Sequence, residues 1–211
     1  MCTCTPALAT LNSIEFSPGG DAAGRWSYDG AGTLRFYQDI AVDSGLGSNY
    51  DTLVGATVCI PTLTVGEGPI GSWRVKPLDN SVLTIKGADG TVYLKATLNA
   101  GDLVPVGTTG VAYTGFTADL TGVTITAAGK ALGSDVLKAI TKMGTTTLDF
   151  ALSLQSGTGT QYTTLADMLS GGFKGTGGFS GAITIPEPAT LALLGLGSLA
   201  LLKKRRQSAK L

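Results

Sequence analysis

The 211-residue chain contains no histidine, and this absence limits the chemistry open to it. Serine and cysteine nucleophiles usually depend on a histidine base, so hydrolases of that kind are disfavoured. The chain also has no G-x-S-x-G elbow, no phosphate-binding P-loop and no complete G-x-G-x-x-G motif. Most of its 12 aspartates lie beside glycine or in turn-like stretches, where aspartate is a turn former. We therefore expect a protein that is not an enzyme and has no cofactor.

Charge is also scarce, at 14% of residues where about 25% is usual. Residues 1–185 carry ten cations and fourteen anions, and five further cations lie in the C-terminal tail. A mildly acidic body with scattered charges has no electrostatic footprint for nucleic acid. We expect no nucleic-acid partner.

Cysteine is rare, with only Cys2, Cys4 and Cys59. An odd count without zinc-like spacing provides no disulfide framework. Cys59 lies in the apolar stretch "ATVCIP", so we expect it to be a small, buried core residue with an unpaired thiol.

Glycine is plentiful, at 31 residues, and the central pattern alternates with period two. The segment "SVLTIK-GADG-TVYLKATL" predicts a hairpin with Leu83 and Ile85 on one face. A second predicted hairpin is "RWSYDGAGTLRFYQ", with Trp26 and Tyr28 before its turn. Further strands are predicted in "TLVGATVCIPTLTV", "GSWRVKP", "TGVTIT", "TTTLDFALSLQ" and "FSGAITI".

One or two short helices interrupt this pattern. The segment "SDVLKAITKMG" has Ser134 as its N-cap and Gly144 as its stop, and "TTLADMLSGG" is a second case. Many short strands with glycine-rich turns indicate an all-β fold, a β-sandwich with jelly-roll-like order. No repeat of fixed period is evident, which disfavours a solenoid.

The expected organisation has four parts. Residues 1–9 are the remnant of a signal peptide, and residues 10–170 form the β-sandwich body. Residues 171–185 are a glycine-rich, flexible lead that includes the last strand. Residues 186–211 form a C-terminal signal with a hydrophobic helix at 189–202 and a basic tail at 203–206.

The run from Ala189 to Leu202 is uncharged, and as a helix its 14 residues span about 21 Å. A hydrocarbon core is ~30 Å thick, so this segment can insert but is short for a permanent anchor. Four consecutive cations follow it and form a cytoplasmic basic stop: Lys203, Lys204, Arg205 and Arg206. The positive-inside rule keeps these cations in the cytoplasm and places residues 1–185 outside the membrane.

The triplet Pro186, Glu187 and Pro188 immediately precedes the apolar run. Proline biases the residue before it to extended geometry, so a stiff and accessible tripeptide lies at the membrane surface. Two alternatives remain: a plain single-pass anchor whose prolines start the helix, and a buried core helix.

The segment "IPEPATLALLGLGSLALLKKRR", Ile185 to Arg206, closely resembles a PEP-CTERM sorting signal, with Pro-Glu-Pro, a short hydrophobic helix and a basic cluster in order. The resemblance implies a bacterial surface or secreted protein, which a membrane-embedded exosortase recognises and cleaves near the motif. It also implies that Pro186, Glu187 and Pro188 are the recognition residues, a substrate site and not a catalytic one. Removal of a short hydrophobic tail is the logic of other C-terminal sorting signals.

A body outside the membrane must be exported, yet the sequence before residue 10 has no basic n-region and no apolar h-region. The Ala7-Leu8-Ala9 pattern suits signal peptidase cleavage before Thr10. We expect a signal peptide whose start lies upstream of Met1. The alternative is a short disordered N-terminus.

Two sets of residues are candidates for ligand binding. Asp39, Asp43 and Asp51 flank "SGLGSNY" and could hold Ca²⁺ through oxygen ligands, but their spacing matches no EF-hand and also fits a solvated loop. A sugar-stacking platform could be formed by three aromatic residues, which equally fit the core: Trp26, Trp73 and Tyr93.

We predict an exported, non-enzymatic bacterial surface protein, membrane-anchored at its C-terminus and then part of the cell surface or extracellular matrix. The structural matrix role follows from the resemblance. The alternatives are an extracellular carbohydrate-binding module and a secreted hydrolase. Expected partners are an exosortase, the export machinery, membrane lipid and extracellular polysaccharide.

Overall fold

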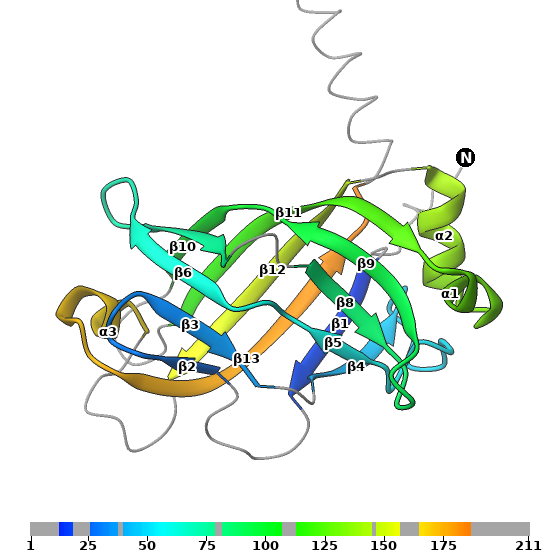
Figure 1. The fold of residues 1–211 in the computed structure, drawn as a ribbon, viewed down its shortest axis with the longest axis horizontal. Coiled ribbons are helices and arrows are strands. Elements are labelled where there is room, and N and C mark those ends of the chain that lie inside the picture. The colour runs from blue at the N-terminus through cyan, green and yellow to red at the C-terminus, as the bar shows by residue number, and fades with distance from the viewer. Residues whose placement is uncertain are drawn as a thin grey trace, which may run out of the picture.

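The computed structural model describes residues 13–18, 26–37, 40–78, 82–106, 113–144, 147–156 and 165–186. These residues form thirteen strands and three short helices (Figure 1). The strands are β1 (Ser13–Pro18), β2 (Trp26–Tyr28), β3 (Thr33–Phe36), β4 (Ile40–Gly45), β5 (Thr57–Cys59), β6 (Leu63–Glu67), β7 (Trp73–Pro77), β8 (Val82–Lys86), β9 (Val92–Leu98), β10 (Gly101–Val106), β11 (Tyr113–Ile125), β12 (Thr147–Ser156) and β13 (Gly175–Thr184). The helices are α1 (Ala127–Ala131), α2 (Asp135–Met143) and α3 (Leu165–Gly171). The prediction of an all-β protein is confirmed. The structure contains α1 in addition to the two predicted helices.

Hydrogen bonds join all thirteen strands into one antiparallel sheet that closes twice. One closed ring runs β1-β4-β5-β8-β9-β11-β12-β13 and returns to β1. The other runs β2-β3-β6-β7-β10-β11-β12-β13 and returns to β2. The rings share β11, β12 and β13, so every strand that the structure describes has a neighbour on both edges. The predicted β-sandwich would consist of two separate sheets, whereas here one continuous sheet forms both rings.

The two rings separate where the long strands β11 and β13 change partners. The first half of β11 pairs with β10, its second half pairs with β9, and its opposite edge pairs with β12. In the same way β13 pairs with β2 near its start and with β1 near its end. On one edge, β11 and β13 are each longer than a single neighbouring strand, so two strands pair along that edge one after the other. The two rings diverge at these changes of partner.

The two predicted hairpins are confirmed. Leu83 and Ile85 of β8 lie opposite Ala96 and Leu94 of β9, and all four side chains are buried. In the other hairpin β2 pairs with β3, and its turn is tied by Asp29. The Asp29 carboxylate accepts hydrogen bonds from the backbone N–H groups of Ala31 and Thr33, at 2.8 and 2.9 Å. The bond from Thr33 is the main cause of the lowered pKa of Asp29.

The core is one continuous hydrophobic cluster enclosed by the sheet. Aromatic rings meet at its centre, where the Phe150 ring lies 6.0 Å from both Phe16 and Phe116. Trp26 is fully buried, and its indole N–H donates to the carbonyl groups of Gln155 and Gly178, at 3.1 and 2.9 Å. The indole thus joins the end of β12 to β13.

The glycine-rich segment before the tail is not the flexible lead that we expected. Gly175 to Gly178 belong to β13, which pairs with β12 from Gly177 to Thr184. A Cβ added at Gly177 would overlap the backbone carbonyl oxygen of Gln155 and lie 2.7 Å from the indole ring of Trp26, so glycine is needed there for close packing. The glycine content of this segment suggested flexibility. In the structure, these glycines lack side chains that would clash with the aromatic residues of the core.

Three strands, β1, β4 and β10, were not predicted from the sequence. Each carries polar residues or a proline that weaken the alternating pattern.

The prediction of a buried Cys59 is wrong. Val58 and Ile60 point into the core, and because side chains alternate along a strand, Cys59 between them faces outward and is partly exposed.

No helix in the described part of the chain is long and apolar enough to cross a membrane. The predicted hydrophobic helix at 189–202 and the predicted signal-peptide remnant at 1–9 lie outside the described residues.

Candidate functional site

The junction between the body and the predicted sorting signal is the first candidate site. Thr184, the last residue of β13, pairs with Asp149 of β12 and with Ser13 of β1. Ile185 is 1% exposed and packs in the core, and the partly exposed Pro186 follows it. The predicted motif therefore begins immediately after Ile185, the last core side chain in the described part of the chain. Glu187, Pro188 and the basic residues Lys203 to Arg206 lie outside the described residues.

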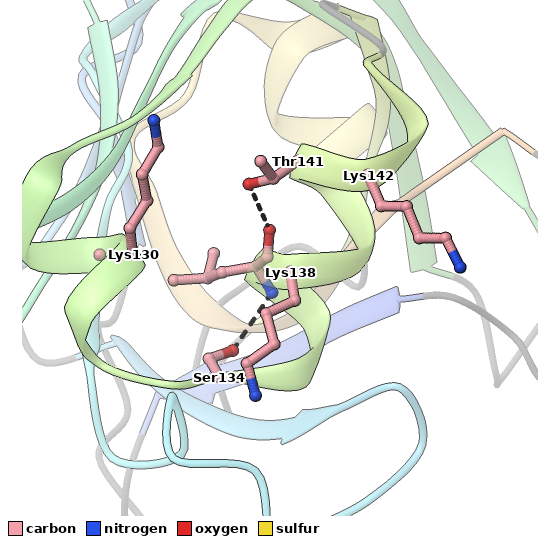
Figure 2. A pocket seen from close by; sticks show the side chains of 7 residues that line it. Lys130, Ser134, Lys138, Thr141 and Lys142 are labelled. Atoms are coloured by element: carbon pink, nitrogen blue, oxygen red, sulfur yellow. Dashed lines mark hydrogen bonds between the residues drawn. The ribbon is translucent and has the colours of Figure 1, made fainter.

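The helices α1 and α2 line a hollow of about 310 Å³ that carries three lysines. Lys130 lies on α1, and Lys138 and Lys142 lie on α2; all three are exposed. Figure 2 shows that their ammonium groups point in different directions and do not converge on one point. The Lys138 ammonium is 2.8 Å from the Asp135 carboxylate, an exposed ion pair of small energetic value. Sequence reasoning treated this segment only as a helix and missed its charge.

The start of α2 is held by its own N-cap and by a residue distant in sequence. The Ser134 hydroxyl accepts from the Leu137 N–H at 3.2 Å, as predicted for the N-cap. The Asp51 carboxylate accepts from the N–H groups of Asp135 and Val136, at 2.9 and 3.1 Å. The first turn of α2 is thus fastened to the loop after β4.

The pKa of Asp51 is lowered although burial alone would raise it. Hydrogen bonds from the Leu53 N–H, the Ser134 side chain and the two α2 amides together outweigh the burial. The carboxylate of Asp51 is therefore already engaged as a structural acceptor.

The candidate calcium ligands have separate roles in the structure. Asp43 accepts a hydrogen bond of 2.6 Å from the Ser17 hydroxyl, whereas Asp51 binds α2. Asp39 lies outside the described residues. Among the residues that the structure places, no group of three acidic, cysteine or histidine side chains is arranged to hold a metal ion.

The three candidate aromatics do not form one surface. Trp26 is a core residue, so it cannot present a face to a sugar. Trp73 of β7 and Tyr93 of β9 are half-buried against the core, with β10 and β11 between their strands. The candidate sugar-stacking platform of all three aromatics is therefore wrong. Of the three, Trp73 and Tyr93 are partly exposed.

The outer face of the shared strands carries two shallow hollows that sequence reasoning did not find. One, of about 440 Å³, is lined by carboxylates from three neighbouring strands, Asp102, Asp119 and Asp149. Asp119 and Asp149 lie directly opposite each other, and Arg74 forms a 2.9 Å ion pair with Asp102. Alternation along β11 and β12 would have placed these aspartates outward, but only the register brings them together.

The second hollow, of about 550 Å³, lies over β4, β1, β13 and β12. Glu15 and Asp43 lie on one side of it, and Ser153 and Ser180 on the other. The Glu15 carboxylate accepts a hydrogen bond of 2.9 Å from Ser44. This polar face offers carboxylate and hydroxyl groups to a hydroxyl-bearing ligand.

Comparison with known families matches residues 184–207 to the PEP-CTERM protein-sorting motif. The resemblance found in residues 185–206 is confirmed, and the matched region begins at the last residue of β13. PEP-CTERM signals are recognised by exosortase, a membrane enzyme, so the motif supports export and sorting through the C-terminus. Comparison with curated proteins and with solved structures gave no match, and the family of the body is not identified.

Proposed function

We propose that this chain is an exported, non-enzymatic surface protein whose body serves as a structural component of the extracellular matrix after an exosortase has cut the tail. The observation that carries this proposal is the sorting motif directly after β13. The motif supports export and sorting, and the matrix role is our inference.

The architecture of the body supports a structural role. A strand with an unpaired edge is a template for uncontrolled pairing with other chains. Because every described strand has a neighbour on each edge over at least part of its length, the body has few free strand edges for such association. A crowded matrix favours this property, since many copies would lie close together.

Replacing Glu187 by Ala tests the processing step. Glu187 is the only charged residue between Ile183 and Leu202, so it is the specific handle that the motif offers to the enzyme. In a host with an exosortase, we expect the wild-type mature protein to lack Ala189 to Leu211. The Glu187→Ala precursor should remain uncut in the membrane fraction.

The matched control is Glu67→Ala, which removes an exposed carboxylate at the end of β6 and should be processed normally. Intact mass spectrometry of the surface fraction reads out both variants. Recovery from wild-type surface protein of a peptide ending at Leu211 would restore the simple-anchor alternative.

The carbohydrate-binding alternative has one observation in its favour, the polar hollow beside Glu15 and Asp43. A glycan array with the wild type, Asp43→Ala and Trp73→Ala separates the two uses of the body. Specific binding lost only in Asp43→Ala would support the polar hollow, and loss only in Trp73→Ala would support ring stacking.

The hydrolase alternative would use Asp119 and Asp149, and release of sugar by wild type but not by Asp149→Asn would establish it.

A further inference from the structure

The lysine-bearing helices lie at the end of the body from which the chain leaves toward the sorting motif. Ser13 pairs with Thr184, and its carbonyl accepts a 2.8 Å hydrogen bond from the Leu46 N–H. Gly45, next to Leu46, is in contact with α2, because a Cβ added there would lie 3.1 Å from a Val136 methyl group. Figure 1 shows α2 and the end of β13 on the same side of the molecule.

The sorting motif limits how far this end can be from the membrane. Five backbone steps separate Thr184 from Ala189, the first residue of the apolar run, so the chain between them spans at most about 18 Å. When the tail is inserted, this end of the body is therefore the one closest to the lipid headgroups. Charges within a Debye length of about 8–10 Å still act on such a surface.

From this placement we infer that Lys130, Lys138 and Lys142 form a docking surface for anionic phospholipid headgroups, which holds the body against the membrane while the exosortase acts. The inference rests on the proposed function, because it requires the tail to be inserted. The divergent ammonium groups suit a surface with many phosphates better than one small anion (Figure 2).

The acids near the lysines reduce the positive charge of this surface but do not abolish it. Asp135 neutralises Lys138 in an ion pair, and Asp51 keeps its negative charge while it accepts hydrogen bonds from backbone amides. The three lysines and these two acids carry three positive and two negative charges, a net charge of +1. Within the described ranges, Lys130 and Lys142 have no ion pair. Tyr50, which precedes Asp51, is 91% exposed and supplies an aromatic residue of the kind enriched at membrane interfaces.

Amine labelling of the full chain in vesicles tests the docking surface. Vesicles would contain either phosphatidylcholine alone or phosphatidylcholine with 30% phosphatidylglycerol, and mass spectrometry would quantify labelling at each lysine. We expect Lys130, Lys138 and Lys142 to be labelled at least threefold less in the anionic vesicles, with the protection lost at high salt. The internal controls are Lys76 of β7 and Lys174, which precedes β13 at its other end, and both should be labelled equally in the two vesicles.

A second readout covers the variants. Hydroxyl-radical oxidation of Tyr50 should be reduced in anionic vesicles, and a triple variant of Lys130→Gln, Lys138→Gln and Lys142→Gln should restore it. The matched double variant, Lys76→Gln with Lys174→Gln, should keep the protection. Alkaline carbonate extraction reports tail insertion separately, so a tail that fails to insert contradicts the proposed function. An inserted tail with unprotected lysines, or protection by an added anionic polysaccharide only, would overturn the docking surface.

Discussion

At the scale of single residues, the glycines of β13 shape the core around aromatic rings. Gly177 lies against the Trp26 indole, and Gly181 lies against the Phe16 ring in the same way. A glycine inside a strand normally weakens it, but here it permits a close approach that no other residue allows. The count of 31 glycines therefore reflects packing as well as turns.

Replacing Gly177 by Ala should destabilise the body by about 2–3 kcal/mol, because the new methyl group clashes with the Gln155 backbone carbonyl and overpacks the site beside Trp26. Gly178→Ala is the matched control, since a Cβ added at Gly178 meets nothing within 4 Å. Chemical denaturation of both variants measures the difference. Equal stabilities would contradict the requirement for glycine at position 177.

Cys59 should react with a thiol reagent in the folded body, because it is partly exposed on the outer side of β5. Labelling should be slower than in the denatured chain but complete without unfolding. Mass spectrometry of the Cys59 peptide reads this out. If the Cys59 thiol were labelled only after the protein unfolds, Cys59 would be a buried core residue.

At the scale of elements, α2 is the clearest case of a segment fixed by both local and distant contacts. Its Ser134 cap and Gly144 stop are readable in the sequence and are confirmed. Its attachment through Asp51 joins groups 84 residues apart, a contact that local patterning cannot reveal.

Asp51→Ala should lower the free energy of unfolding by about 1–2 kcal/mol at pH 7, the typical value of a helix cap. Asp43→Ala, which removes an exposed carboxylate bonded to the Ser17 hydroxyl, should cost less than about 0.5 kcal/mol. Denaturation curves of the two variants give the comparison. A larger loss in Asp43→Ala would contradict the role of Asp51.

The pH dependence follows from the lowered pKa of Asp51. A carboxyl group with a folded-state pKa below its ordinary value of about 3.9 stabilises the protein above that value and loses this contribution as the pH falls through the lowered pKa. The stability difference between wild type and Asp51→Asn should therefore be largest near neutral pH and shrink below about pH 4. A difference that grows in acid would refute the sign.

The elements show which parts of the fold were predictable. Hairpins with uninterrupted alternation, such as β8 with β9, and a helix with both caps follow from local chemistry. β1 depends on a partner far along the chain, β13, and the double closure depends on β11 and β13 changing partners. The sorting motif was readable because its chemistry is local, whereas the lysine and aspartate surfaces arise only from register and packing.

At the scale of the whole molecule, the last described strand ends where the sorting motif begins. Proteolytic removal of Ala189 to Leu211 should leave the melting temperature of the body within about 2 °C of that of the full chain in detergent. The reason is that β13 ends at Thr184 and that, among the residues the structure describes, the last core side chain is Ile185. A large decrease on removal would mean that the tail supports the body.

The control for this experiment is Ile185→Ala in the full chain, which should cost about 2–5 kcal/mol because it empties a buried position. Calorimetry of the cut protein, the full chain and this variant compares the two sides of the junction. The variant should melt well below both.

The double-edged pairing of β13 also has a mechanical consequence. A pull on the C-terminus acts along the axis of β13, whose hydrogen bonds to β12 on one side and to β1 and β2 on the other lie across that axis. Such a load is a shear load, under which these hydrogen bonds resist together and do not break one after another. While the uncut tail is held in the membrane, a force on this terminus would therefore be transmitted into β11, β12 and β13, the three strands that both rings share.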